Sequence, residues 1–260
     1  MRARSSDVVS ATSSLSARDG ADVRWLLLSV AFVWVATAVL VVFPYYREIG
    51  GQYLDRLGLP HWLMFGTCAF ELLLGLRVAF GRPTTVLLAL QVGMVATFTV
   101  ILAVDEPLLL AHPYGVLTKN LPLVGALGVA SYAWHRGFDA RATTALRVAM
   151  ALPWLTEGLF PKLLFQQASE LEVVRASGLV PMDPGAFLRI LGVAQILSAV
   201  AALALRGTPR RALLIAQAAS LLVLPVLVAW HDPHLWIHPF APLLKNVPIL
   251  VGTIILVRRP

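Results

Sequence analysis

The chain has 260 residues, of which 58% are hydrophobic and only 13% are charged, and its mean hydropathy is +0.77. So few charged residues exclude a soluble globular domain of this length, and we expect an integral membrane protein. The single cysteine, Cys68, excludes an intramolecular disulfide and a paired-cysteine redox site. No glycine-rich nucleotide-binding motif is present. The net charge of +7 comes mostly from cations in short loops beside apolar runs, which indicates membrane topology and not nucleic-acid binding.

The first 24 residues are rich in serine and arginine and carry charges of both signs. We predict that residues 1–24 form a disordered cytoplasmic tail and not a cleaved signal peptide, because the apolar run that follows is long enough to span a membrane. Eight apolar runs follow, with lengths close to that of the hydrocarbon core. They are residues 25–43, 61–80, 84–104, 114–134, 146–161, 186–205, 211–230 and 239–257. Because the alternation of a barrel is missing, the expected fold is an all-α membrane protein with eight transmembrane helices.

The distribution of positive charge predicts the orientation of these spans. With the N-terminus inside, fourteen of the 21 lysines and arginines fall in the tail and in the loops on the same side. The remaining seven fall on the other side or at its helix ends. The positive-inside rule then places both termini in the cytoplasm.

The chain contains an internal repeat. Residues 112–122, His-Pro-Tyr-Gly-Val-Leu-Thr-Lys-Asn-Leu-Pro, recur as residues 238–248, His-Pro-Phe-Ala-Pro-Leu-Leu-Lys-Asn-Val-Pro, with six of eleven positions identical. Four predicted helices separate equivalent positions, so the halves run in the same direction and are related by a pseudo-two-fold axis along the membrane normal. We expect two four-helix bundles, residues 25–135 and 146–257, joined by a linker at 136–145.

Each half also carries an amphipathic segment after its first span. In residues 45–57 and 162–176, apolar side chains recur at helical spacing opposite charged and amide side chains. This pattern predicts two helices that lie at the outer interface of the membrane. Such helices either tile the lipid surface or cover a cavity between the spans.

The repeated motif carries Lys119 and Lys245 into apolar runs, and each is followed by an asparagine, Asn120 or Asn246. A charge at that depth costs several kcal/mol unless it snorkels or is paired. If the segment is helical, each lysine lies about 10 Å beyond its histidine. One such lysine is read as snorkelling to the headgroups, but two at equivalent positions favour a polar site inside the bundle. A further lysine, Lys162, lies five positions after a glutamate and is a second candidate partner for it, although an intervening proline makes that geometry awkward.

Two carboxylates lie within predicted spans, Glu71 in the second and Glu157 in the fifth. The counterpart of Glu71 in the second half is Gln195, so each half keeps one carboxylate and one lysine. We hypothesise that Lys119 neutralises Glu71 and that Lys245 neutralises Glu157, with one ion pair in each bundle. These pairs serve either catalysis and proton transfer or only the packing of helices, and both interpretations stay open.

Histidines gather near the ends of the predicted spans. His231, His234 and His238 have a spacing that suits a divalent metal, but the prolines between them disfavour a common helical face, and we expect no metal site. Histidines near span ends are poorly placed to hold a haem inside the bundle, so helix capping is the favoured role. The candidate ligand-site or proton-site residues are Glu71, His112, Lys119, Asn120, Glu157, Lys162, Gln195, His238, Lys245 and Asn246.

The motifs of the second half resemble those of a known family. They are residues 154–165, 192–195 and 238–248. Together they are similar to the DoxX-like four-helix membrane proteins. The resemblance covers residues 146–257 well and residues 25–134 as a more diverged copy, so the chain resembles a tandem duplication of that unit. Gln195 stands where the family pattern carries an acidic residue, whereas Glu71 keeps an acid in the first half.

The resemblance implies a class of function. DoxX itself is associated with quinone-linked sulfur oxidation as a small membrane subunit, and relatives with membrane redox or thiol-stress complexes. Because this chain has no redox cysteine pair and no evident haem ligands, the resemblance implies a quinone-like or lipid-like ligand site, or an anchor for an oxidoreductase subunit, in a bacterial cytoplasmic membrane. A small-solute or proton-coupled transporter and a non-catalytic scaffold are the alternatives. Membrane lipid is the other expected partner, and whether the chain is an enzyme stays open.

Overall fold

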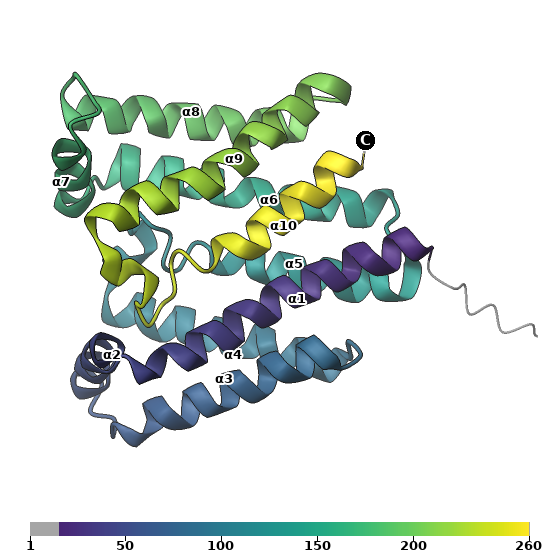
Figure 1. Cartoon of the computed structure of the whole chain (residues 1–260), viewed down its shortest axis with the longest axis horizontal. Helices are drawn as coiled ribbons and strands as arrows, with labels where there is room; N and C mark the ends of the chain where they lie inside the picture. Colours follow the sequence, from purple (N-terminus) through teal and green to yellow (C-terminus); the bar gives the residue numbers. More distant parts are fainter. Residues whose placement is uncertain (1–15, 260) are drawn as a thin grey trace, which may run out of the picture.

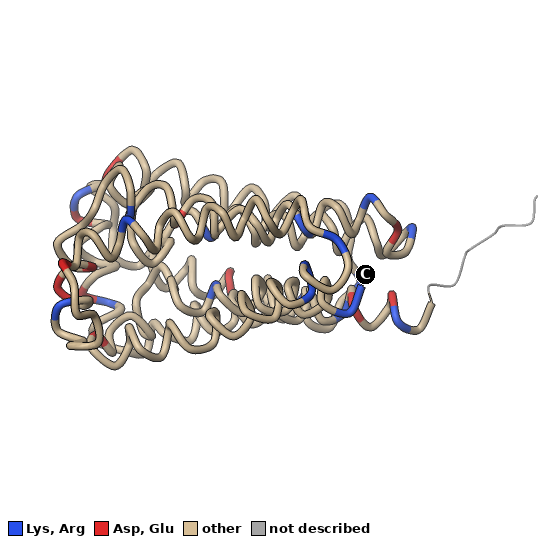
Figure 2. The backbone as a smooth tube through the Cα atoms, turned by 90° about the horizontal axis from the view of Figure 1, so that it is seen from above, with Lys and Arg blue, Asp and Glu red and all other residues tan. Residues whose placement is uncertain are grey.

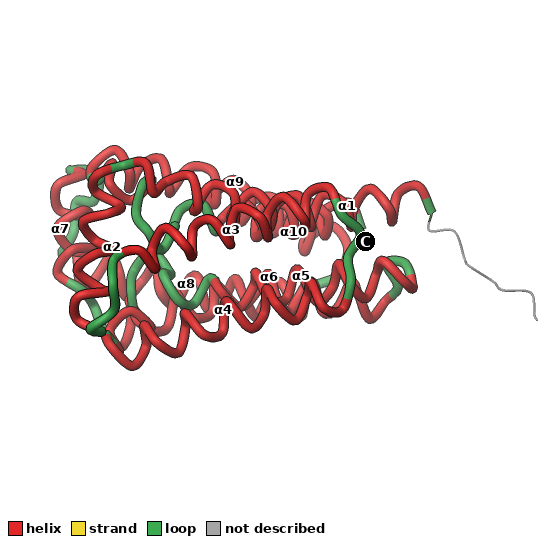
Figure 3. Tube along the Cα trace, turned by 90° about the horizontal axis from the view of Figure 1, so that it is seen from below, coloured by secondary structure: helices red, strands yellow, loops and turns green. Residues whose placement is uncertain are grey.

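The computed structural model describes residues 16–259, and every regular element in that range is a helix (Figure 3). The α-helices are α1 (Ala17–Val39), α2 (Pro44–Arg56), α3 (Trp62–Phe80), α4 (Thr85–Asp105), α5 (Asn120–Arg136), α6 (Ala140–Glu157), α7 (Ala168–Ser177), α8 (Pro184–Ala204), α9 (Gly207–His231) and α10 (Asn246–Arg258). Three short 3₁₀-helices and one π-helix join them: η1 (Leu40–Val42), η2 (Pro107–Ala111), η4 (Pro233–Trp236) and the π-helix η3 (Gly158–Leu164). The all-α prediction is confirmed.

Five helices within residues 16–259 are long and apolar enough to cross a membrane, namely α1 with η1, α3, α4, α8 and α9. A sixth crossing is formed if α6 and η3 are counted with α7, to which they are bent by 94°. The eight expected spans are therefore not eight long helices. The fourth span of each half is broken, because α5 begins only at Asn120 and has 17 residues, while α10 begins at Asn246 and has 13.

The two halves, α1–α5 and α6–α10, repeat the same order of elements in the same direction. Figure 1 shows α1 and α6 starting at the same end of the molecule, and the short helices α2 and α7 both lying at the opposite end. At the centre, α5 and α10 contact each other, and each of them contacts both α1 and α6. Helix α3 packs on α1 and α8 packs on α6, while α4 and α9 flank α5 and α10. The repeat seen in the sequence is thus a repeat of architecture.

The core lies between the central helices, and the outer surface is apolar. Leu26, Leu127, Leu146 and Ile249 come one each from α1, α5, α6 and α10 and are fully buried. In contrast, the Phe80 side chain at the C-terminal end of α3 is 82% exposed. Charged residues concentrate toward the two ends of the molecule, with few between them (Figure 2). A wide apolar outer surface is what a protein surrounded by lipid presents, and it supports an integral membrane protein.

The first helix begins earlier than its apolar run. Helix α1 starts at Ala17, where the Ser16 hydroxyl accepts a hydrogen bond from the Asp19 backbone N–H at 3.1 Å. Asp19 and Asp22 both bind the Arg259 guanidinium, at 2.7 and 2.5 Å, which ties the start of α1 to the end of α10. The predicted disordered tail is therefore wrong for residues 17–24, and residues 1–15 lie outside the described range.

The connection between the halves is shorter than the linker predicted at residues 136–145. Helix α5 ends at Arg136 and α6 begins at Ala140. Gly137 ends α5 with φ of +77°, a conformation that glycine adopts without strain. The Asp139 carboxylate caps α6 by accepting the Ala142 N–H at 2.8 Å. The polar residues of this segment therefore cap helices and do not form an extended linker.

Candidate functional site

Both repeated lysines stand at the start of a helix and not inside one. Lys119 and Lys245 are the N-cap residues of α5 and α10, each preceded by turns that begin at the histidine of the motif. The turns include Gly115 with φ of +67° and, at the equivalent place, Ala241 with φ of +46°. The expected helical path from histidine to lysine is therefore wrong, because left-handed backbone at these positions cannot belong to an α-helix.

The motif histidines shape these turns. The His112 Nδ1 accepts a hydrogen bond from the Tyr114 N–H at 3.3 Å, and the His238 Nδ1 accepts one from the Phe240 N–H at 3.2 Å. An Nδ1 that accepts a hydrogen bond carries no proton, so both imidazoles are neutral in this arrangement. Their place in the turns gives them a structural role in positioning the lysines.

Each lysine reaches into the other half of the molecule. The Lys119 ammonium donates to the Pro242 carbonyl at 3.1 Å, and the Lys245 ammonium donates to the Val116 carbonyl at 2.8 Å. The two bonds are reciprocal, because Pro242 and Val116 occupy equivalent positions of the repeat. Each motif loop, residues 112–119 or residues 238–245, therefore places its lysine against the other half, and we call this arrangement the exchange of lysines.

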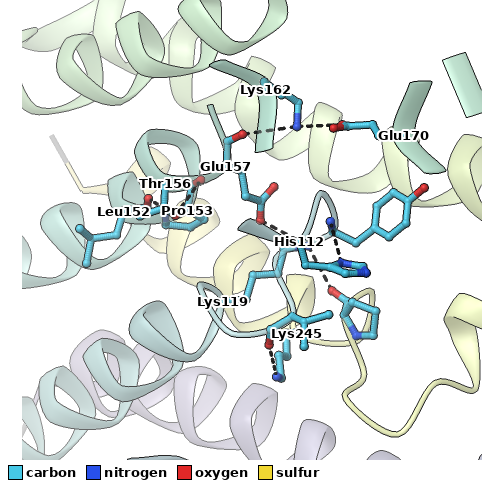
Figure 4. A network of polar contacts seen from close by, with 12 residues as sticks. His112, Lys119, Leu152, Pro153, Thr156, Glu157, Lys162, Glu170 and Lys245 are labelled. Carbon is cyan, nitrogen blue, oxygen red and sulfur yellow. Dashed lines mark hydrogen bonds and ion pairs between the residues drawn. The ribbon is translucent and has the colours of Figure 1, made fainter. Parts of the chain in front are cut away.

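This exchange overturns the predicted pairing within each bundle. The Lys119 Nζ lies 3.5 Å from the Glu157 Oε1, so a lysine of the first half pairs with a carboxylate of the second (Figure 4). Lys245 lines a cavity with Glu71, but the two side chains form no direct ion pair. The prediction assumed that each half packs as a closed bundle. It was wrong because α5 and α10 contact each other at the centre, and the loop before each helix contacts the loop before the other.

Lys162 also has a different partner from the one expected. The π-helix that contains Pro161 turns the Lys162 ammonium back toward the Glu157 backbone carbonyl, at 3.4 Å, and not toward the Glu157 carboxylate. Its ion pair is with Glu170 of α7, at 3.0 Å. Figure 4 shows the resulting series of polar groups, which runs from Lys119 through Glu157 and Lys162 to Glu170.

The candidate residues divide between two cavities. The first cavity has a volume of about 280 Å³ and lies among α1–α5 and the motif loop of the second half. Its walls are mainly apolar, and its charged and amide groups are Glu71, Asn120 and Lys245. The Asn120 amide donates to the Thr99 hydroxyl at 2.8 Å, but the Glu71 Oε2 has no hydrogen-bond partner among residues 16–259. This cavity combines an apolar chamber with one carboxyl and one ammonium.

The second cavity has a volume of about 250 Å³ and lies among α6–α10 and the motif loop of the first half. It is the repeat-related counterpart of the first cavity and is more polar. Its charged and amide residues are Lys119, Glu157, Lys162, Glu170, Gln195 and Asn246. Eight of the ten candidate residues therefore face one of the two cavities, while His112 and His238 lie in the turns beside them.

The amphipathic helices cover these cavities. Tyr46, Gly50 and Tyr53 of α2 line the first cavity, while Glu170 and Val173 of α7 line the second. Of the two interpretations given above, covering a cavity describes both helices. Glu170 belongs to the charged and amide face of the segment 162–176, and helical spacing alone does not predict its contact with Lys162.

A polar latch holds α2 over the first cavity. The Tyr53 hydroxyl donates to the Glu106 carboxylate at 2.7 Å, and Arg56 binds Asp105 at 2.8 Å and Glu106 at 3.3 Å. Burial and the neighbouring Glu106 carboxylate raise the pKa of Tyr53 to about 12, so the phenol remains a donor at neutral pH. No local sequence pattern predicts this latch, because its members are about fifty residues apart.

The comparisons with known proteins agree with the repeat. The sequence model of the DoxX-like family matches the chain twice, over residues 31–128 and again over residues 151–254. Together these matches span more than half of the chain. The chain belongs to the DoxX-like family. The two matches also confirm a tandem duplication of the family unit, and each DoxX-like unit contributes one lysine to the cavity of the other. No curated protein and no solved structure matches the chain.

Proposed function

We propose that this DoxX-like protein binds a quinone-like amphiphile in its first cavity and serves as the membrane subunit of a redox complex. The observation that carries the proposal is the placement of Glu71 and Lys245, which face the same apolar cavity without pairing with each other. A lone carboxyl and a lone ammonium in apolar surroundings are costly unless another polar group lies between them.

A quinone head matches these groups. The Lys245 ammonium has three N–H donors and gives one to the Val116 carbonyl, which leaves donors for a quinone carbonyl. The Glu71 carboxyl is placed to exchange a proton with the ligand, as quinone reduction and quinol oxidation require. The apolar walls suit the ring and the beginning of an isoprenoid tail. Electron transfer then requires a partner oxidoreductase, for which this chain supplies the membrane anchor.

We further propose that the chain crosses a bacterial cytoplasmic membrane eight times with both termini inside. Helix α10 is about 20 Å long at 1.5 Å per residue, too short for a core of about 30 Å. The turns before α5 and α10 complete these crossings, since irregular backbone is tolerated at membrane depth where protein surrounds it. Both described ends lie at one end of the molecule, in keeping with an even number of crossings (Figure 1).

The test of ligand binding uses the purified full chain in detergent and decylubiquinone as the probe. We expect the quinone to raise the unfolding temperature of the protein, and Glu71→Gln to weaken the apparent affinity about ten-fold, as loss of a charged hydrogen bond does. The matched control is Gln195→Leu, which changes the second cavity and leaves quinone binding unchanged. Absence of any quinone-dependent shift, or equal effects of the two variants, contradicts the proposal.

A second candidate function is proton-coupled or small-solute transport. The series Lys119, Glu157, Lys162 and Glu170 supports it, because connected titratable groups at membrane depth are typical of ion and proton pathways. The test is the decay of an imposed pH gradient in proteoliposomes with the wild-type chain and with Glu157→Gln. Transport predicts a leak that the substitution abolishes, and equal decay with empty liposomes rejects this candidate.

A further inference from the structure

The second cavity holds an unusual number of polar atoms without partners. Among residues 16–259, five side-chain atoms of residues that line this cavity have no hydrogen-bond partner, although one of them, the Glu157 Oε1, lies 3.5 Å from the Lys119 ammonium as its ion-pair partner. They are the Trp154 Nε1, Glu157 Oε1, Glu170 Oε2, Gln195 Oε1 and Asn246 Oδ1. Glu170, Gln195 and Asn246 are each more than nine-tenths buried, with exposed fractions of 8%, 7% and 7%. An unpaired buried polar group destabilises the fold, so the clustering of the other four atoms in one cavity indicates a built binding site.

The repeat shows why two of these atoms, the Asn246 Oδ1 and the Trp154 Nε1, lack the partners that their counterparts have. In the first half, Asn120 bonds to Thr99, and the Trp34 indole donates to Gln91 at 3.1 Å. The residue equivalent to Thr99 is Pro225, which has no hydroxyl for Asn246. The residue equivalent to Gln91 is Gln217, whose amide donates to the Ser198 hydroxyl at 2.7 Å, and Trp154 is left unpaired. Two polar side chains that are hydrogen-bonded within the first half are therefore unpaired at the equivalent positions of the second half.

The polar atoms without hydrogen-bond partners in the second cavity favour a ligand that donates hydrogen bonds. The carboxylate oxygens of Glu157 and Glu170 accept hydrogen bonds and, when ionised, donate none. The amides of Gln195 and Asn246 accept or donate according to their orientation. The charges already cancel, because the cavity holds two lysines and two glutamates. A neutral ligand therefore adds no uncompensated charge to the interior.

The volume and the apolar walls of the second cavity limit the size and the apolar part of the ligand. Phe187, Leu188, Leu191 and Leu224 form apolar walls beside the polar groups. A cavity of about 150 Å³ accepts one benzene ring, so a volume of about 250 Å³ suits one ring with polar substituents. The polar atoms come from α6, α7, α8 and α10, so they approach such a ring from several sides.

We propose that the second cavity is a distinct binding site for a small neutral molecule with one apolar ring and two or more hydroxyl donors. The oxygens of the two carboxylates and of the Gln195 and Asn246 amides accept hydrogen bonds from the hydroxyl groups, and the Trp154 indole donates one to a hydroxyl oxygen. This site does not depend on quinone binding in the first cavity, because it uses different residues. The duplicated family unit thereby carries two cavities of different ligand chemistry.

The test uses catechol, with two hydroxyls, against 1,2-dimethoxybenzene, which has the same ring and no donor. Binding to the purified full chain is measured by isothermal titration calorimetry. We expect catechol to bind at least ten-fold more tightly than its dimethyl ether. Equal binding of the two probes overturns the proposal, as does no binding of catechol, which is the result expected if the cavity holds water alone.

Gln195→Leu separates a ligand site from a structural one. The Gln195 side-chain oxygen has no partner to lose, so this substitution of similar volume removes an unpaired polar group and raises thermal stability. The same substitution weakens catechol binding about three- to ten-fold. Trp154→Phe is the second variant and has the same expected direction in binding, while Glu71→Gln in the first cavity is the control and leaves catechol binding unchanged. Catechol affinity that ignores both Gln195→Leu and Trp154→Phe overturns the proposal.

Discussion

The two cavities occupy equivalent places in the duplicated fold but differ in what their polar groups do. In the first half, Asn120 is satisfied by Thr99, and the cavity keeps Glu71 and Lys245 apart in apolar surroundings. In the second half, Gln195 replaces Glu71, and the carboxylate is that of Glu157, at the position equivalent to Thr37. Glu157 pairs directly with Lys119. A few substitutions on one scaffold have therefore produced one apolar and one polar chamber.

The comparison also shows why the halves cannot act separately. Each cavity receives its lysine from the other half, and the Lys119 and Lys245 bonds to Pro242 and Val116 tie the two motif loops together. A substitution in one loop therefore acts on the cavity of the other half. Substitutions at equivalent positions of the two halves therefore serve as controls for each other.

The largest difference is expected between the two lysines. Lys119→Met leaves the Glu157 carboxylate without its cation, and loss of one partner of a buried pair is expected to lower the free energy of unfolding by about 3 kcal/mol. Lys245→Met removes a hydrogen bond to Val116 but no direct ion pair, so about 1–2 kcal/mol is expected. Thermal unfolding of both variants in detergent measures the contrast. Equal losses contradict it.

The second difference concerns the left-handed turn residues. Gly115→Ala is expected to destabilise by about 2 kcal/mol, because φ is +67° and the new Cβ lies 2.5 Å from the Glu157 Oε1. Ala241 has φ of +46°, so Ala241→Gly relieves strain and is expected to stabilise by about 0.5 kcal/mol after the entropy of glycine is included. The same melting assay tests both, and a destabilised Ala241→Gly contradicts this explanation.

A smaller difference is expected between the two asparagines. Asn120→Leu breaks the bond to Thr99, and a loss of about 1 kcal/mol is expected. Asn246→Leu removes an unpaired Oδ1 and is expected to leave stability unchanged or to raise it. Unfolding curves of the two variants at matched detergent concentration decide the point, and an equal loss in both shows that the asparagines are not in different environments.

The smallest effect is expected at the connection between the halves, outside both cavities. The Ala142 N–H and the Tyr132 hydroxyl bind the Asp139 carboxylate and hold its pKa below the ordinary value. A lowered folded-state pKa gives stability that is present above the unfolded-state pKa and is lost as the pH falls through the folded-state pKa. Asp139→Asn should therefore flatten the fall in unfolding temperature below about pH 4. An unchanged acid profile contradicts this role.

The sequence predicts the fold better than the site. Apolar runs and the repeated motif are local patterns, and they identify the long helices and the duplication. The lysine partners depend on how α5 and α10 meet, and no local pattern encodes this. The bond from Gln217 to Ser198 is likewise a tertiary feature, and the left-handed backbone at Ala241 is unexpected for a residue with a side chain. The ten candidate residues can be recognised because charged and amide side chains are rare in apolar helices. Which of them line the same cavity depends on the tertiary structure.

The exchange of lysines between the halves is tested most directly by two double-mutant cycles measured on the free energy of unfolding. One cycle combines Lys119→Met with Glu157→Gln, and the other combines Lys119→Met with Glu71→Gln. The exchange predicts a coupling energy of about 1.5 kcal/mol or more in the first cycle and less than about 0.5 kcal/mol in the second. Strong coupling between Lys119 and Glu71, with none between Lys119 and Glu157, contradicts it.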